Sequence, residues 1–215
     1  PAPLHPDEPT RVAALHRYRV LDTTAERQFD EMACLASALC ETPMAAISFI
    51  AERRQWFKAE VGLGVRETGR DVSVCAYAIL GDEDIFEIPD LAEDSRTADN
   101  PCVNGPQQLR FYASAPLRSH DGRAIGTLCV MDRRPRRLSR VQRLALRTLG
   151  NQVMAQLELR RVLTDRIRIE RRASRERRHA GLALAAGRMG LWELDPGRDT
   201  LRLGDGMDAI LGLDP

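Results

Sequence analysis

Five cysteines are the residues of this chain best suited to covalent, redox or metal chemistry: Cys34, Cys40, Cys75, Cys102 and Cys129. No two of them form a CxxC pair, and no histidine lies near them at zinc-ligand spacing. We therefore expect reduced thiols, a cytoplasmic location and no metal site. Cys75 lies between Val74 and Ala76 with no basic neighbour to lower its pKa, which favours a small buried residue over a reactive thiol.

A second polar group occupies the long connection 90–109, which contains Asp90, Asp94, Arg96, Asp99 and Asn100. The group lacks the regular spacing and the terminal glutamate of a calcium loop. Asx turns, an N-cap before Pro101 and an ion pair from Arg110 to the loop explain these residues without a metal. A connection of this length without structure of its own is often functional.

The elements that must position these groups alternate between helical and extended patterns. Two helices are expected over 10–20 and 24–40, the second with an apolar stripe of Phe29, Met32, Ala33, Ala36, Leu39 and Cys40. Strands are expected over 44–52, 55–62, 84–90, 110–118 and 124–132, a loop over 62–71 and a helix start at Ser73. These elements predict an α+β fold whose central antiparallel sheet of five to six strands is flanked by helices.

Strand alternation assigns side chains to the two faces of this sheet. Trp56 and Lys58 fall on one face and Phe57 on the other. Tyr112 lies in the strand 110–118, where its hydroxyl can point into a pocket and orient a ligand. For Phe57 a structural role is favoured over ligand binding, because one face of the sheet must be core.

A long helix is predicted from Ser139 for about forty residues. Five of its apolar residues fit the a and d positions of one heptad frame, which Gln156 and Arg160 interrupt: Leu146, Leu149, Val153, Leu163 and Ile167. A helix of this length cannot bury its stripe against one small domain. The pattern therefore predicts a homodimer in which a second copy covers the stripe.

Charge is concentrated in the same region, although the net charge of the chain is only +1. Residues 133–178 hold 16 arginines and 4 acidic residues, which suggests an arginine-rich nucleic-acid arm as one hypothesis. Without an aromatic residue to stack on a base, and with apolar residues at helical spacing, this stretch fits a solvated helix better. The sequence contains no apolar run long enough for a membrane span.

The succession of motifs resembles a bacterial GAF domain of the type found in sensor histidine kinases and diguanylate cyclases. The matching stretches are RVAALHRYRVLDTTAERQFDEMACLA, TPMAAISFIAERRQWFKAEVGL, ETGRDVSVCAYAI, PDLAEDSRTADNPCV and RFYASAPLRSHDGRAIGTLCVMDRRPRRLS. The tail resembles the opening of a PAS domain, through Trp192 and the stretch GMDAILGL. The predicted organisation is an N-terminal extension (1–10), a GAF domain (11–158), a basic signalling helix (159–186) and a truncated PAS domain (187–215).

The GAF resemblance implies a ligand pocket on one face of the sheet, roofed by the middle helix and the long connection. It also implies that the first and last helices pack together and commonly form a dimer. The residues expected at the pocket are Phe57, Cys75, Asp90, Arg110, Tyr112 and Cys129. GAF domains similar to this one bind cyclic nucleotides, tetrapyrroles, haem or small metabolites, so the cofactor is not specified.

The expected function is a cytosolic sensory input module that relays a signal through the long helix to a PAS or output domain outside these residues. No catalytic constellation appears, so we expect no enzyme in this chain and a histidine kinase or diguanylate cyclase as the longer protein. One alternative is a GAF-type thiol enzyme similar to free methionine sulfoxide reductases, acting through Cys75 and Cys102. The glycine-rich setting of those enzymes' cysteines is absent here, and Ala76 stands where a bilin-binding GAF domain usually has histidine.

Overall fold

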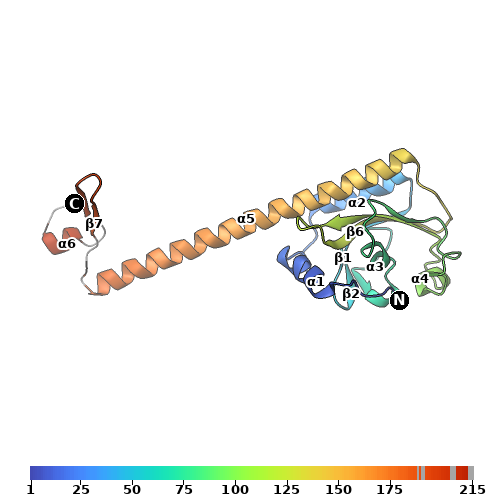
Figure 1. Cartoon of the computed structure of the whole chain (residues 1–215), viewed down its shortest axis with the longest axis horizontal. Coiled ribbons are helices and arrows are strands. Elements are labelled where there is room, and N and C mark those ends of the chain that lie inside the picture. The colour runs from blue at the N-terminus through green and yellow to red at the C-terminus, as the bar shows by residue number, and fades with distance from the viewer. Residues whose placement is uncertain (188, 190–191, 204–206, 213–215) are drawn as a thin grey trace. The chain divides into compact units, whose positions relative to one another are not determined.

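The computed structural model describes residues 1–187, 189, 192–203 and 207–212, which divide into two units, 1–161 and 162–215. The first unit is built on a six-stranded sheet with the order β3-β2-β1-β6-β5-β4, in which every neighbouring pair is antiparallel (Figure 1). The strands are β1 (Met44–Ile50), β2 (Arg54–Val61), β3 (Glu67–Gly69), β4 (Phe86–Ile88), β5 (Phe111–Arg118) and β6 (Ala124–Asp132). The predicted α+β class and strand number are confirmed.

Helices cover both faces of this sheet. They are α1 (Glu8–Arg17), α2 (Arg27–Cys40), the 3-10 turn Arg70–Val72, α3 (Cys75–Ala78), α4 (Pro101–Asn104) and α5 (Arg140–Gly187). The helix starts predicted near Ser73 and from Ser139 are confirmed: the Ser139 hydroxyl caps α5 by accepting from the Gln142 amide at 3.2 Å, and the Ser73 hydroxyl, one residue before the N-cap Val74, accepts from the Ala76 amide at 3.2 Å.

Three local expectations were wrong. Helix α1 begins at Glu8, before the expected cap, and the Thr10 hydroxyl donates to Asp7 instead. The segment expected as a loop contains β3, which pairs with β2 at the edge of the sheet. Leu39 is 46% exposed because α2 packs through Phe29, Ala33, Ala36 and Cys40, and Leu39 lies beside that stripe.

One face of the sheet is apolar and is covered by α1, α2 and the first part of α5. Leu146, Val153 and Leu157 of α5 are fully buried in this layer, and Leu149 packs against it. The expectation that Leu146, Leu149 and Val153 leave an exposed seam was therefore wrong: the sheet of their own domain covers them. Leu163 and Ile167, the other two heptad residues, are 50% and 48% exposed.

Lys58 is a buried cation on this face. A bulge in the β1–β2 ladder leaves Lys58 between the pairs Ile47–Ala59 and Ser48–Phe57. Its ammonium donates to the Glu26 carboxylate at 2.6 Å and to the Thr23 hydroxyl and Thr24 carbonyl. The predicted alternation is confirmed, since Trp56 packs on this face and Phe57 on the other.

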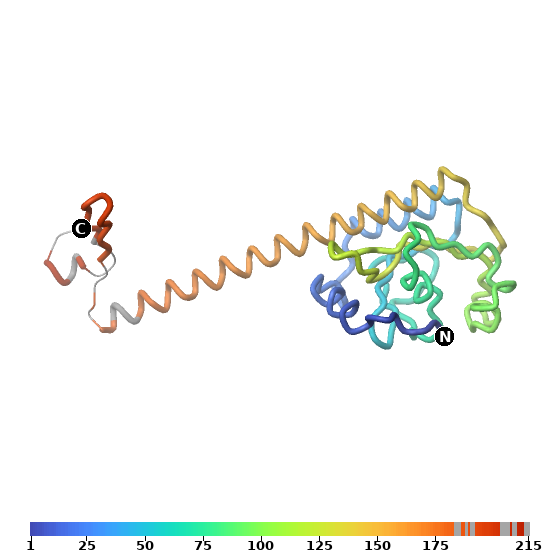
Figure 2. The backbone as a smooth tube through the Cα atoms, viewed as in Figure 1, coloured from blue at the N-terminus to red at the C-terminus, as the bar shows by residue number. Residues whose placement is uncertain are grey.

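The opposite face is covered by α3, α4 and the connection 89–110, the green segment of Figure 2. Leu91, Val103 and Leu109 from this connection are buried against residues of α3 and the sheet. Asn100 caps α4 by accepting from the Cys102 amide at 2.8 Å, and its own amide donates to the Val72 carbonyl. The connection is therefore an ordered roof.

The second unit contains the rest of α5 and a hairpin. Strands β7 (Trp192–Asp195) and β8 (Thr200–Leu203) pair antiparallel, and α6 (Met207–Leu211) follows. The assignment of 187–215 to a PAS domain stays a prediction, and residues 188, 190–191, 204–206 and 213–215 within it lie outside the described residues.

Candidate functional site

A polar patch lies at the centre of the sheet face that α3 covers. It consists of Ser48, Gln55, Cys75, Tyr112, Ser114, Thr127 and Cys129, all of which are buried. Strand pairing brings them together, because Ser48 is opposite Thr127 across β1–β6 and Ser114 is opposite Cys129 across β5–β6. The hydroxyls of Ser48 and Thr127 lie 3.1 Å apart. Buried polar groups at the middle of a sheet are costly unless they have partners, which marks this patch as a candidate ligand site.

Two thiols form the sulfur part of the polar patch. The Sγ atoms of Cys75 in α3 and Cys129 in β6 lie 3.9 Å apart. The Gln55 side-chain amide donates to Cys75 Sγ at 3.0 Å, and Cys129 Sγ lies 3.5 Å from the Ala46 carbonyl oxygen. Cys75 therefore has Cys129 as its sulfur neighbour, whereas the Cys102 sulfur lies 4.0 Å from the Val72 carbonyl.

The two thiols of the patch differ in their tendency to ionise. Burial opposes a thiolate at Cys75, but hydrogen bonds from neighbouring groups, Cys129 first, outweigh burial and lower its pKa. The hydrogen bond to Cys75 and burial raise the pKa of Cys129 well above its ordinary value. The pair therefore carries at most one negative charge, on Cys75.

Two hydroxyls of the patch have incomplete hydrogen bonding. Tyr112 Oη and Ser114 Oγ are buried without a well-formed hydrogen bond in the described part of the chain. An unsatisfied buried hydroxyl costs about 1–3 kcal/mol, so a small polar molecule that bonded to them would gain that stabilisation. Burial raises the pKa of Tyr112 well above its ordinary value, so its hydroxyl is a neutral donor.

A surface hollow lies next to this patch. The hollow has a volume of about 640 Å³ and is lined by Tyr77, Leu80, Glu83, Phe86 and Arg96, among others. Phe86 separates the hollow from the patch: its ring meets the Tyr112 ring edge-on, with centroids 6.1 Å apart.

The structure brings together four of the six residues expected at the pocket. Phe57, Cys75, Tyr112 and Cys129 share one buried cluster. Asp90 lies away from them, in a shallow groove with Arg136 and Arg137. Arg110 holds the roof in place, as expected, but through the carbonyls of Val103 and Leu109 at 2.9 Å instead of an ion pair.

Sequence reasoning missed the polar members contributed by the strands. Ser48, Ser114 and Thr127 each occupy an inward position in a strand whose other inward residues are mostly apolar. A small polar residue at an inward position of an otherwise apolar strand face is the sequence pattern that could have indicated these members. No three His, Cys, Asp or Glu side chains gather into a metal-binding group within the described ranges, and no helix there is long and apolar enough to cross a membrane.

Comparison with known families decides the assignment of this fold. The family model described as GAF domain matches residues 19–157, which is more than half of the chain. The chain belongs to the GAF domain family. The resemblance read from the sequence motifs is thereby confirmed for the GAF domain, while the PAS resemblance stays a prediction.

Solved structures support the same fold. A domain of a putative two-component sensor histidine kinase from Sinorhizobium meliloti aligns with a TM-score of 0.53 at 17% identity, covering 67% of this chain and 99% of that one. The GAF domain of PixJ from Thermosynechococcus elongatus aligns with a TM-score of 0.52 at 17% identity, covering 73% and 94%. At these identities the likeness concerns the fold alone.

A curated relative corrects the expectation about enzymes. Cyclic di-GMP phosphodiesterase PA2567 of Pseudomonas aeruginosa is 44% identical over 134 residues, which are 62% of this chain and 23% of that protein. The chain thus spans about a quarter of the length of this relative. The expectation of no enzyme and of a kinase or cyclase as the longer protein was wrong, because this similarity, confined to the GAF region, points to an enzyme-related protein.

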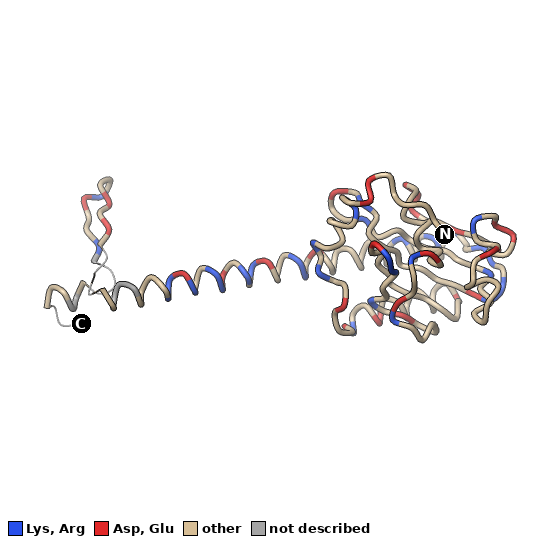
Figure 3. The backbone as a smooth tube through the Cα atoms, turned by 90° about the horizontal axis from the view of Figure 1, so that it is seen from below, with Lys and Arg blue, Asp and Glu red and all other residues tan. Residues whose placement is uncertain are grey.

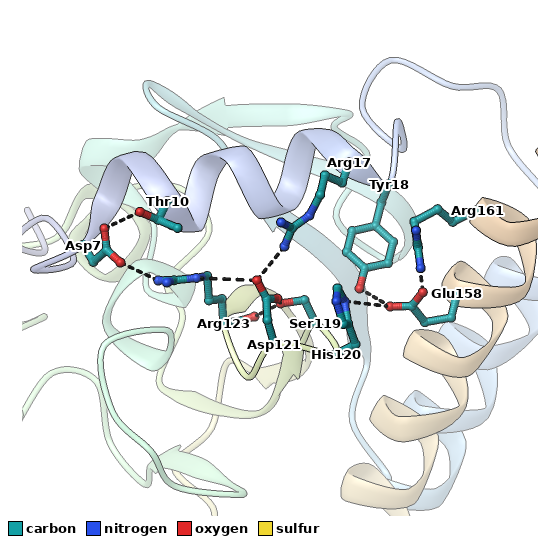
Figure 4. A network of polar contacts seen from close by, with 10 residues as sticks. All are labelled: Asp7, Thr10, Arg17, Tyr18, Ser119, His120, Asp121, Arg123, Glu158 and Arg161. Carbon is teal, nitrogen blue, oxygen red and sulfur yellow. Dashed lines mark hydrogen bonds and ion pairs between the residues drawn. The ribbon is translucent and has the colours of Figure 1, made fainter. Parts of the chain in front are cut away.

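The GAF domain also carries an exposed polar network that joins three of its elements (Figure 4). We call it the hairpin clamp: the β5–β6 turn, residues 119–123, is bonded to α1 and to α5. Asp121 accepts from Arg17 at 2.6 Å, Arg123 donates to Asp7 at 2.6 Å, and His120 lies 3.7 Å from Glu158.

Glu158 is the α5 end of the hairpin clamp. Besides His120, it accepts from the Tyr18 hydroxyl and from Arg161, the latter at 2.9 Å. Helix α1, the turn between β5 and β6, and α5 therefore meet at one carboxylate, close to where the first unit ends.

A second carboxylate ties α1 to the segment before α3. Glu8 accepts from Arg11, whose side chain is fully buried, and from Arg70, which also donates to the Ala51 carbonyl at 3.0 Å. Burial opposes the charge on Glu8, but the two arginines outweigh it and lower the pKa of Glu8 to about 2.

The GAF domain should therefore lose stability in acid through Glu8. Glu8 has a pKa of about 2 in the folded chain and an ordinary value of 4.5. As the pH falls, the unfolded chain therefore binds a proton at Glu8 before the folded chain does. The contribution of Glu8 is present above pH 4.5 and is lost as the pH falls towards 2. Chemical denaturation at a series of pH values should show a weaker acid dependence in Glu8→Gln than in the wild type.

The matched control for this measurement is Glu31→Gln, because Glu31 pairs with Arg27 on the exposed surface of α2. Exposed pairs contribute little, so this variant should follow the wild type. Equal acid dependence in Glu8→Gln and the wild type would contradict the assignment.

Proposed function

We propose that this chain is a sensory GAF module that regulates a cyclic di-GMP phosphodiesterase in a longer protein. The observation that carries the proposal is the course of β6. This strand contributes Thr127 and Cys129 to the polar patch, ends at Asp132, and is followed within seven residues by α5. The 44% identity to a protein named as a cyclic di-GMP phosphodiesterase supports the choice of output.

The proposed ligand is a small polar molecule bound on the polar patch beneath α3. The hydroxyls of Tyr112 and Ser114, which lack a well-formed hydrogen bond, and the donor groups around Cys75 offer it hydrogen bonds. Phe86 would act as the entry gate, since it lies between the patch and the surface hollow. The chemical identity of this ligand is left open, as it was in the sequence analysis.

The proposed relay has two routes to α5. The covalent route runs from β6 through residues 133–139, where Arg136 bonds to Asp132 and to the Pro89 carbonyl of the roof. The second route is the hairpin clamp, in which the β5–β6 turn contacts Glu158 of α5. A displacement of β5 and β6 by a bound ligand would therefore reach α5 at both ends of its buried part.

The proposed partner of α5 is a second copy of the same helix. Leu159, Val162, Leu163, Ile167 and Ile169 are all about half exposed or more. Some of the charged residues of this part of α5 form pairs within the helix, such as Arg166–Glu170 at 3.1 Å and Arg172–Glu176 at 2.9 Å, and blue and red segments both occur along it in Figure 3. These ion pairs favour a solvated, paired helix over a nucleic-acid arm.

A second surface would extend the homodimer to the N-terminal helices. The start of α5 exposes Val141 and Leu144, and α2 exposes Leu35 and Leu39. These helices are neighbours, because the Gln142 amide donates to the Leu39 carbonyl at 3.4 Å.

Regulation through α5 is tested by changing its phase in the full-length protein that contains this chain. Four residues inserted after Arg168 rotate everything downstream by about 40°, whereas seven residues rotate it by only about 20°. We expect the four-residue insertion to change the rate of cyclic di-GMP hydrolysis by about fivefold or more, the low end of allosteric coupling. The seven-residue insertion is the matched control and should stay near the wild-type rate. Wild-type rates for both insertions would overturn the relay.

The homodimer is tested by light scattering at tens of micromolar. Replacing Leu163 and Ile167 with glutamate should convert the dimer to a monomer, since each position loses about 1.5–3 kcal/mol of apolar burial and gains a charge. Leu146→Ala should instead lower the free energy of unfolding by about 2–5 kcal/mol and leave the dimer intact, because Leu146 is fully buried in its own domain. A monomeric wild type would contradict the proposal.

A further inference from the structure

Cys75 and Cys129 are two neighbouring thiols of the polar patch, for which the proposed function assigns no covalent chemistry. They come from different elements, the roof helix α3 and the central strand β6, and their sulfurs lie 3.9 Å apart. A disulfide needs a separation of about 2.05 Å, so closure requires the sulfurs to approach by about 2 Å. Helix α3 has only four residues, and a rotation of the Cys75 side chain with a small shift of this helix supplies that movement.

The surroundings of the pair suit an ionised sulfur at Cys75. The Gln55 amide donates to it at 3.0 Å, and the Ser48 and Thr127 hydroxyls lie in the same buried patch. These donors take the place that a cation occupies at many reactive thiols. The lowered pKa of Cys75 and the raised pKa of Cys129 agree with this division of roles.

We propose that Cys75 and Cys129 are a dithiol site that a small hydroperoxide oxidises to an intradomain disulfide. The Cys75 thiolate attacks one oxygen of the hydroperoxide, the O–O bond breaks, and the alkoxide or hydroxide that leaves takes up the proton that Cys75 had released. Cys75 is then a sulfenic acid. The Cys129 thiol attacks the Cys75 sulfur, the S–S bond forms, and hydroxide leaves with the Cys129 proton as water. Two electrons pass from the two thiols to the hydroperoxide.

The order in which the two cysteines react follows from their positions. Cys75 lies in the roof and is 3% exposed, whereas Cys129 lies in the sheet and is fully buried. A small uncharged oxidant therefore meets Cys75 first, and Cys129 is the resolving thiol. Cys102 is only partly buried, but burial and then the charge on Cys75 raise its pKa, so it stays a thiol.

The disulfide would link the roof to the strand that precedes α5. With the bond closed, α3 can no longer separate from β6 at Cys129, which fixes the cover of the polar patch. This inference stands apart from the proposed function, because the oxidation occurs whether or not the domain binds a ligand or controls a phosphodiesterase.

The test is peptide mapping of the folded chain after exposure to hydrogen peroxide. The protein is then alkylated under denaturing conditions and digested without reduction. We expect a peptide pair joined through Cys75 and Cys129 that dithiothreitol separates. Free, fully alkylated Cys75 and Cys129 after this exposure, or a Cys75–Cys102 link in place of Cys75–Cys129, would overturn the proposal.

Two variants sharpen this result. Cys129→Ser removes the resolving thiol and should leave a sulfenic acid on Cys75 that dimedone traps. Cys102→Ser is the matched control and should form the Cys75–Cys129 link as fast as the wild type. Circular dichroism before oxidation establishes that each variant is folded, and the wild-type mapping decides the question if a variant is not. Because the readout is a covalent bond, its failure does not bear on phosphodiesterase regulation.

Discussion

The packing of α5 against the apolar face of the sheet is the contact on which the rest of this structure depends. Leu146, Val153 and Leu157 are fully buried there, so the first part of the helix belongs to the core of the GAF domain. The same helix continues without a break to Gly187. A helix that is part of a close-packed core cannot stay in place when the strands beneath it move. This rigidity is the physical basis of the relay proposed above.

The two faces of the sheet have different physical characters, and alternation along the strands produces both. In β5, Phe111, Ala113 and Ala115 point to the apolar layer, while Tyr112 and Ser114 point to the polar patch. The apolar face supplies stability through burial. The polar face contains hydroxyls and thiols whose hydrogen bonds are incomplete, so the proposed ligand or the proposed oxidation would change its free energy. Strands β5 and β6 belong to both faces and connect the two.

Much of the fold follows from local patterns. The β-branched and aromatic runs predicted five of the six strands of the large sheet, and Ser73 and Ser139 marked their helix starts through capping. The surface that covers the heptad residues was harder to predict, because an apolar stripe has the same spacing whether a sheet or another helix packs against it. For Leu146 and Val153 the cover is the sheet of their own domain. The three-residue strand β3 is set by pairing with β2, and no local signal marks it.

The candidate site was predictable only in part, because it depends on contacts between distant segments. The motifs placed Cys75, Tyr112 and Cys129 near one pocket, but they gave no sign that the Cys75 and Cys129 sulfurs lie next to each other, because that contact between residues 54 apart comes from the packing of α3 on β6. The order of the motifs also placed Asp90 at the pocket, but in the structure its carboxylate accepts from the Ala92 amide in a local turn away from the pocket.

Hydrogen exchange by mass spectrometry tests the central claim, that the first part of α5 belongs to the domain core, most directly. The amides of 146–157 and of β6 should exchange together, at the rate of global unfolding. Rapid exchange of 146–157 while β6 stays protected would contradict a helix built into the domain core.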